Sequence, residues 1–129
     1  MDKIIKMSKN YGVSGFICTN LTKKNIGFGK GGLSGKAVQH LSDKMIAYIY
    51  KNTRNWTRKP IIVGVGGIFT AEDAYRKIRL GASLLEMITG MIYEGPQVVG
   101  EINRGMVRLL KRDGFRNISE AVGTLKKWN

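Results

Sequence analysis

The sequence is poor in the residues that build disulfide frameworks, metal clusters and membrane spans. It has one cysteine, one histidine and two prolines among 129 residues, so an internal disulfide is impossible and no metal-ligand spacing is present. No apolar run approaches the roughly 18 residues of a membrane-spanning helix, and the N-terminus "MDKIIKMSKN" is too polar for a signal peptide. We therefore expect a soluble chain in which Cys18, inside the apolar run "VSGFICTN", is a buried and inert thiol.

Acidic residues are scarce as well. Nine Asp and Glu stand against 22 Lys and Arg, which gives a net charge of +13. The basic residues are spread over several helix-like segments without the aromatic interleaving of nucleic-acid-binding segments, a distribution typical of solvated helix faces. We expect no nucleic-acid partner, only a long-range attraction for anionic ligands or an anionic membrane face.

Apolar residues switch repeatedly between helical and strand periodicity along the chain. The runs "VSGFICTN", "PIIVGVGG" and "SLLEMITG" predict three strands, the second of them covered on both faces. Helices are predicted at "DKIIKMSKNYG", "AVQHLSDKMIAYIYKNT", "AEDAYRKIRLG" and "PQVVGEINRGMVRLLKRDG". Thr70 is the expected N-cap of the third helix and Pro96 the first residue of the fourth. This alternation predicts an α/β fold with parallel strands.

Three parallel strands are too few to close a sheet on itself. A (β/α)8 barrel needs eight strands in about 250 residues, about twice the length of this chain. We therefore predict a single incomplete domain over residues 1–129, a partial (β/α)8 TIM barrel of about three C-terminal βα units. Such a piece leaves two sheet edges and one barrel-interior face open, so it is either part of a larger barrel or a protein that needs a partner.

Glycine-rich loops follow the first and second predicted strands, where ligands bind in barrels of this type. In "GGLSGK", Ser34 offers a hydroxyl and Gly35 a backbone amide. In "VGVGGIFTAEDA", consecutive amides lead into a helix N-terminus, which favours phosphate. A plain turn explains either loop alone equally well. The two loops together with Thr89, on the third predicted strand, favour a phosphate site.

The remaining ionisable residues are weaker candidates. His40 lies on a predicted helix and is expected at the surface or in packing rather than as a base. Glu72 and Asp73 are placed for the helix dipole, and Glu86 is expected to face the helix layer with a basic partner. No Ser/His/Asp arrangement and no paired carboxylates are visible in the sequence.

Several segments, in this order, resemble the C-terminal half of quinone-dependent (class 2) dihydroorotate dehydrogenases: "GFICTN", "GGLSGKAVQHLS", "PIIVGVGGIFTAEDAYRKIRLGASLLEMITGMIYEGPQVV" and "DGFRNISEAVG". The resemblance extends from about Val13 to Gly123. It implies a (β/α)8 flavoenzyme of pyrimidine biosynthesis that oxidises dihydroorotate to orotate and passes electrons through FMN to ubiquinone. It also implies an absent N-terminal half-barrel and, for a eukaryotic source, attachment to the mitochondrial inner membrane through that absent region.

The resemblance assigns roles to residues at the strand ends. Asn20 matches the asparagine that hydrogen-bonds orotate, and Leu21 stands where the family usually has a threonine. The positions that resemble FMN contacts are Thr19 beside the flavin, Ser34 and Gly35 in the first half of the phosphate clamp, Gly66 and Gly67 in its second half, and Ile88 and Thr89 closing over the phosphate. Ile88 replaces a tyrosine of many members, so only its backbone amide carries over.

The resemblance also says what the chain lacks. The catalytic serine base, the lysine near the flavin and the quinone-tunnel helices belong to the absent half, so no catalytic residue is expected here and the chain alone should be inactive. Two other functions stay open. One is a non-catalytic flavin- or phosphate-binding half-barrel that pairs with another chain or with itself. The other is a different FMN-dependent barrel oxidoreductase, such as a dihydropyrimidine dehydrogenase domain, although "GGLSGKAVQHLS" favours the first family.

Overall fold

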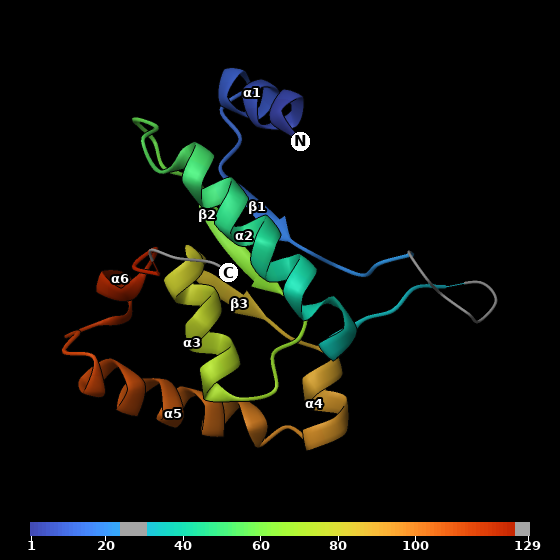
Figure 1. The fold of residues 1–129 in the computed structure, drawn as a ribbon, viewed down its shortest axis with the longest axis vertical. Helices are drawn as coiled ribbons and strands as arrows, with labels where there is room; N and C mark the ends of the chain where they lie inside the picture. The colour runs from blue at the N-terminus through green and yellow to red at the C-terminus, as the bar shows by residue number, and fades with distance from the viewer. Residues whose placement is uncertain (24–30, 126–129) are drawn as a thin grey trace.

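A three-stranded parallel sheet lies at the centre of the computed structural model, which describes residues 1–23 and 31–125 (Figure 1). The strands are β1 (Gly15–Cys18), β2 (Ile61–Val65) and β3 (Leu84–Glu86), with β2 in the middle. The register pairs Cys18 with Gly64 and Val65 with Glu86, which brings the carboxyl ends of all three strands to one edge. The predicted α/β fold with three parallel strands is confirmed.

The helices follow the strands in the predicted alternation. They are α1 (Asp2–Asn10), the 3-10 helix η1 (Gly35–Val38), α2 (Gln39–Thr53), α3 (Ala71–Leu80), α4 (Thr89–Glu94), α5 (Val98–Arg112) and α6 (Ile118–Ala121). Figure 1 shows α2 and α3 on the same side of the sheet, with α5 packed against α3. Across residues 1–23 and 31–125, none of the helices has the length and apolarity that a membrane crossing requires.

One face of the sheet forms the hydrophobic core together with α2 and α3. Cys18 and Ile62 point into this layer and meet the buried side chains of Ile46, Ile49 and Ile78. Each of these isoleucine side chains contributes about 1.5–3 kcal/mol when it is fully buried. The core therefore holds the helices to the sheet on this side only.

The other face of the sheet is open. Ile17, Ile61 and Leu84 alternate with the core residues along their strands, and their exposed fractions are 69%, 50% and 56%. The prediction that β2 is covered on both faces is therefore wrong for this chain, because nothing within its described residues packs on that side. The predicted open barrel-interior face is confirmed, since side chains on this face of a closed barrel would fill its interior.

Several element boundaries differ from the sequence predictions. The helix expected to begin at Pro96 begins at Val98, with Gln97 as its N-cap. Thr89 is the first residue of α4 and not part of β3, which is shorter than predicted. Thr70 is the N-cap of α3 as predicted, and its hydroxyl accepts a hydrogen bond from the backbone N–H of Asp73 at 3.2 Å. Part of the predicted glycine-rich loop, residues 24–30, lies outside the described residues.

Candidate functional site

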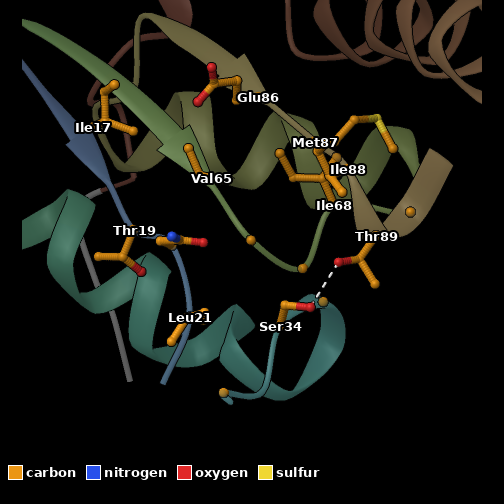
Figure 2. Close-up of a pocket in the computed structure, with 16 residues that line it drawn as sticks. Ile17, Thr19, Leu21, Ser34, Val65, Ile68, Glu86, Met87, Ile88 and Thr89 are labelled. Atoms are coloured by element: carbon orange, nitrogen blue, oxygen red, sulfur yellow. Dashed lines mark hydrogen bonds between the residues drawn. The ribbon is translucent and has the colours of Figure 1, made fainter. Parts of the chain in front are cut away.

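A cavity of about 570 Å³ opens at the carboxyl ends of the three strands (Figure 2). This volume is within the range of about 300–1,000 Å³ that is usual for small-ligand sites. All the residues predicted as cofactor or substrate contacts line it: Thr19, Asn20, Leu21, Ser34, Gly35, Gly66, Gly67, Ile88 and Thr89. Residues from four separate segments of the chain thus meet at one place.

The sequence analysis missed other residues that line the same cavity: Ile17, Gly32, Val65, Ile68, Glu86, Met87 and Gly90. Three of these, Ile17, Val65 and Glu86, are strand residues whose side chains lie on the open sheet face (Figure 2). The alternation of side chains along a strand was a signal that could have identified them. Glu86 was expected to face the helix layer with a basic partner, and that expectation is wrong, since Glu86 lies beside Val65 on the opposite face.

Two hydroxyl groups face each other at the mouth of this cavity. The Ser34 Oγ and Thr89 Oγ1 atoms lie 3.0 Å apart, joining the segment before η1 to the start of α4 (Figure 2). Gly35 has a φ of 65°, and a Cβ there would lie 2.6 Å from Thr89 Cγ2. Glycine is therefore required on both conformational and steric grounds. The missing side chain lets the backbone of the loop approach Thr89 closely.

The turn after β2 is built from two glycines in the left-handed region. Gly66 and Gly67 have φ values of 99° and 72°. A Cβ on Gly67 would lie 2.3 Å from the Cβ of Gln39, and one on Gly66 would lie 2.8 Å from Val38 Cγ2. The turn therefore presses against the η1–α2 junction, with no side chain of its own in the cavity. Its backbone is the part that a ligand would meet.

The N-terminus of α3 does not contribute to the cavity, contrary to the sequence prediction. Residues 69–71 are not among those that line it. Two backbone N–H groups at this end have partners within the chain: the Thr70 hydroxyl accepts from the N–H of Asp73, and the Asp73 carboxylate accepts from the N–H of Phe69, both at 3.2 Å. A ligand in the cavity would therefore meet the glycine turn rather than the end of the helix dipole.

The segment after β1 is held in place by backbone pairing. The N–H of Thr19 donates to the Val65 carbonyl at 3.2 Å, and Thr22 and Leu33 exchange backbone hydrogen bonds of 3.0 and 2.9 Å. A Cβ on Gly32 would lie 2.3 Å from Leu21 Cδ1, so the glycine leaves room for the leucine side chain. These contacts bring the β1 end and the loop before η1 to the same side of the cavity.

Charge at the cavity is sparse. Glu86 is the ionisable residue among the described residues that line it, and no lysine or arginine does so. Lys36 follows Gly35 in the chain, and its exposed Nζ lies 3.5 Å from Asp73 Oδ2. His40 is exposed on α2 and does not line the cavity, in line with its expected surface position. An anion here would rely on hydroxyls and backbone amides, with the net positive charge of the chain acting from a distance.

A buried polar cluster lies directly behind the cavity, and the sequence analysis did not foresee it. Lys77 is 0% and Asp43 1% exposed, and Lys77 Nζ lies 2.6 Å from Asp43 Oδ1. Burial lowers the pKa of Lys77, although its hydrogen bond and ion pair with Asp43 act in the opposite direction. A sequence signal that could have indicated this cluster is a charged residue within an apolar helix stripe. Lys77 lies beside Ala74 and Ile78 on the buried face of α3.

Asp73 does more than complement the helix dipole. Its carboxylate accepts hydrogen bonds from Gln39 at 2.6 Å and from Arg76 at 3.0 Å. Burial alone would raise the pKa of Asp73, but the Arg76 hydrogen bond, the Lys36 charge and the Gln39 and Phe69 hydrogen bonds together bring it below its ordinary value of 3.8. Gln39 also donates to the Gly67 carbonyl at 2.5 Å, so Asp73 is connected to the glycine turn.

The only cysteine behaves as expected. Cys18 is 1% exposed at the end of β1, and burial raises the pKa of its thiol from 9.0 to about 11. The thiolate is the reactive form of cysteine, so this thiol is unreactive near neutral pH.

Comparison with known proteins gives a consistent family. A family model described as "Dihydroorotate dehydrogenase" matches residues 2–110. The curated "Dihydroorotate dehydrogenase (quinone)" of Crocosphaera subtropica is 44% identical over 134 residues, and that of Roseiflexus castenholzii is 39% identical over 134 residues. These alignments cover 93% and 99% of this chain but 35% and 36% of the relatives. The chain therefore spans about a third of the length of the curated relatives it matches, less than the half suggested by the resemblance.

Solved structures show the same relationship. A crystal structure of ligand-free DHODH from Eimeria tenella superposes with a TM-score of 0.86 at 32% identity, covering 97% of this chain and 36% of that chain. A structure of DHODH in complex with ferulenol from the same organism gives a TM-score of 0.86 at 34% identity. The three-stranded fold is therefore part of a larger barrel in these proteins.

Proposed function

This chain belongs to the dihydroorotate dehydrogenase family, and we propose that its cavity holds the phosphate end of FMN in an enzyme that oxidises dihydroorotate to orotate with a quinone as electron acceptor. The observation that carries the proposal is the meeting of two glycine turns with the Ser34–Thr89 hydroxyl pair at the strand ends. Hydroxyls and turn amides are the groups that bind phosphate where no basic side chain is at hand.

The residues of the cavity fit such a group. Gly35, Gly66 and Gly67 all line the cavity, and because they have no side chain, only their backbone would meet a ligand there. The two hydroxyls hydrogen-bond to each other at 3.0 Å, which leaves one of their two hydrogens for an anion; an anion that displaces this bond would accept from both. Glu86, the carboxylate among the described residues that line the cavity, lies on β3 and apart from this pair (Figure 2).

FMN, when bound, supplies the acceptor for the electrons of dihydroorotate. The part assigned to this chain is binding and orientation. Ser34, Thr89 and the glycine turns would hold the cofactor tail, and the Asn20 amide is available to hydrogen-bond the substrate. Leu21 cannot supply the hydroxyl that the family usually has at this position. The apolar side chains of Ile17, Val65 and Ile68 would exclude water from the interior of the site.

A second candidate function is a non-catalytic half-barrel that binds a flavin or phosphate with a partner chain. Its support is the open sheet face, on which Ile17 is 69% and Leu84 56% exposed. The other alternative, a different FMN-dependent barrel oxidoreductase, is less well supported, because the matching family model and the two relatives named above carry the name dihydroorotate dehydrogenase. Three features of the whole enzyme stay predictions: the use of ubiquinone, the need for an N-terminal half-barrel, and attachment to a membrane.

Reconstitution separates the two candidate functions. This chain would be mixed with the separately expressed region of the Crocosphaera subtropica relative that it does not cover, and FMN would be added under anaerobic conditions. The enzyme function predicts a yellow complex whose flavin absorbance bleaches when dihydroorotate is added. A stable yellow complex that dihydroorotate does not bleach would support the non-catalytic half-barrel. The absence of bound flavin in every mixture would contradict both.

A further inference from the structure

The buried cluster behind the cavity ends on the two strands that carry the site. Lys77 and Ser42 are both 0% exposed and Asp43 is 1% exposed, so all three polar side chains lie inside the helix–sheet layer. Lys77 comes from α3, whereas Ser42 and Asp43 come from α2. Burying a charged pair is expensive, and an apolar pair of similar volume at such a position is often as stable or more stable. Stability alone therefore does not account for the buried charges of Lys77 and Asp43.

The hydrogen bonds fix the direction of the Ser42 hydroxyl. Lys77 Nζ donates to Ser42 Oγ at 2.9 Å and is itself held by Asp43 Oδ1 at 2.6 Å. An ammonium group has donors only, so Ser42 must accept from it, and the single hydroxyl hydrogen of Ser42 remains for another acceptor. That acceptor is a strand carbonyl, since Ser42 Oγ lies 2.5 Å from the Val65 oxygen and 3.3 Å from the Cys18 oxygen.

Both carbonyls belong to the last residues of their strands. Cys18 ends β1 and precedes Thr19, and Val65 ends β2 and precedes Gly66. The Val65 oxygen also accepts the N–H of Thr19 at 3.2 Å, so it joins the ends of the two strands. Lys77 is thus connected, through Ser42, to the residues at which β1 and β2 end and the chain begins to line two sides of the cavity.

The same network reaches the glycine turn by a second route. Asp43 accepts from Arg76 Nε at 2.9 Å, and Arg76 donates to Asp73 at 3.0 Å. Asp73 accepts from Gln39, whose amide also donates to the Gly67 carbonyl. A continuous set of hydrogen bonds, several of them charge-assisted, therefore connects the β1 end, the β2 end and the second glycine of the turn.

We propose that Lys77 is a positioning residue for the cavity: its ammonium, locked by Asp43, orients the Ser42 hydroxyl toward the strand-end carbonyls and so fixes Thr19 and the Gly66–Gly67 turn in their binding geometry. This role rests on the proposed FMN site for its functional meaning. Its structural part, the fixing of the strand ends, holds with or without a ligand. No contact of Lys77 with the cofactor is implied, because Lys77 does not line the cavity.

The test uses two variants and a matched control. Lys77→Met removes the ammonium and keeps an unbranched side chain. The double variant Asp43→Leu with Lys77→Met replaces the whole pair by apolar side chains, which is expected to restore the urea midpoint that the single variant loses. Arg79→Met removes another cation from α3, one whose side chain pairs with Asp113 at 3.3 Å and donates to Thr124 at 3.2 Å, neither of which belongs to a strand end.

Hydrogen exchange measured by mass spectrometry gives a readout that a purely structural role would not produce. In both Lys77 variants, exchange at residues 15–22 and 61–68 should rise by about tenfold or more, while exchange in α5 changes by less than about twofold. The FMN dissociation constant should rise about tenfold in both, although the double variant has recovered its stability. Arg79→Met should leave the strand-end exchange and the FMN affinity unchanged.

The outcomes separate this inference from the proposed function. Exchange that rises uniformly over the chain, or strand-end exchange and FMN affinity that return to wild-type values in the double variant, would overturn the positioning role. Failure of the wild-type chain to bind FMN, alone or with the complementary region, would count against the proposed function. In that case, localised exchange at the strand ends would still support the fixing of β1 and β2 by Lys77.

Discussion

The hydroxyl of Ser34 lies 3.0 Å from the hydroxyl of Thr89, although the two residues are 55 positions apart in the chain. Ser34 precedes the 3-10 helix η1, and Thr89 begins α4 after the third strand. Their meeting depends on the parallel pairing of the strands, which brings their carboxyl ends to one edge of the sheet, and on the absence of a side chain at Gly35, where a Cβ would lie 2.6 Å from Thr89 Cγ2. Two independent elements thus present hydroxyl donors at one point of the cavity.

The first prediction concerns this pair. Ser34→Ala and Thr89→Val should each weaken FMN binding by about tenfold or more, because a hydrogen bond to a charged group contributes about 1.5–3 kcal/mol. Riboflavin, which lacks the phosphate, should bind both variants and the wild type equally. Fluorescence titration measures both affinities. Ser119→Ala, an exposed serine on α6, is the control. Equal losses of FMN and riboflavin affinity would show that the pair does not act on the phosphate.

The second prediction concerns the turn after β2. Gly67→Ala should lower the free energy of unfolding by about 2 kcal/mol or more, because a φ of 72° strains an alanine and its Cβ would lie 2.3 Å from Gln39 Cβ. Gly12→Ala is the matched control, with a φ of 65° and no atom within 4 Å of the added Cβ. Gly12→Ala should lower the free energy of unfolding only by the backbone strain, about 1 kcal/mol. Urea unfolding compares the two, and equal losses would argue against the close approach at Gly67.

These two sites also show what the sequence could and could not predict. The glycine pattern, the strand runs and the N-cap at Thr70 are local signals, and the structure places Ser34, Gly66 and Thr89 around one cavity as expected. The sequence analysis did not foresee the cluster of Lys77 with Asp43. The two residues are 34 positions apart on different helices, and charged residues are usually solvated. Likewise, only the three-dimensional register shows that Glu86 lies on the open face.

The third prediction is a pH dependence that comes from Asp73. Its pKa in the folded chain lies below the ordinary value of 3.8, so the unfolded chain binds more protons in acid. The stability contributed by Asp73 is therefore fully present above pH 3.8 and is lost as the pH falls through the lower folded value. Asp73→Asn should be less stable than the wild type at pH 6, and the difference should shrink toward pH 3. Urea midpoints at a series of pH values would show this, and a difference that is constant with pH would contradict it.

The fourth prediction distinguishes the two faces of the sheet. Ile17→Thr should change the free energy of unfolding by less than about 0.5 kcal/mol, because Ile17 is 69% exposed. Ile62→Ala, at a position 2% exposed on the covered face, should cost about 2–5 kcal/mol. Ile17→Thr should nevertheless weaken association with the complementary barrel region, measured by sedimentation. A large loss of stability from Ile17→Thr in the chain alone would mean that this face is already covered.

The central proposal is that this chain supplies the phosphate site for FMN. The decisive measurement compares the dissociation constants of FMN and riboflavin for this chain combined with the region of the Crocosphaera subtropica relative that it does not cover. FMN should bind at least about tenfold more tightly than riboflavin, because riboflavin has no phosphate for the hydroxyls and glycine turns to bind. Equal affinities for the two flavins would contradict the account.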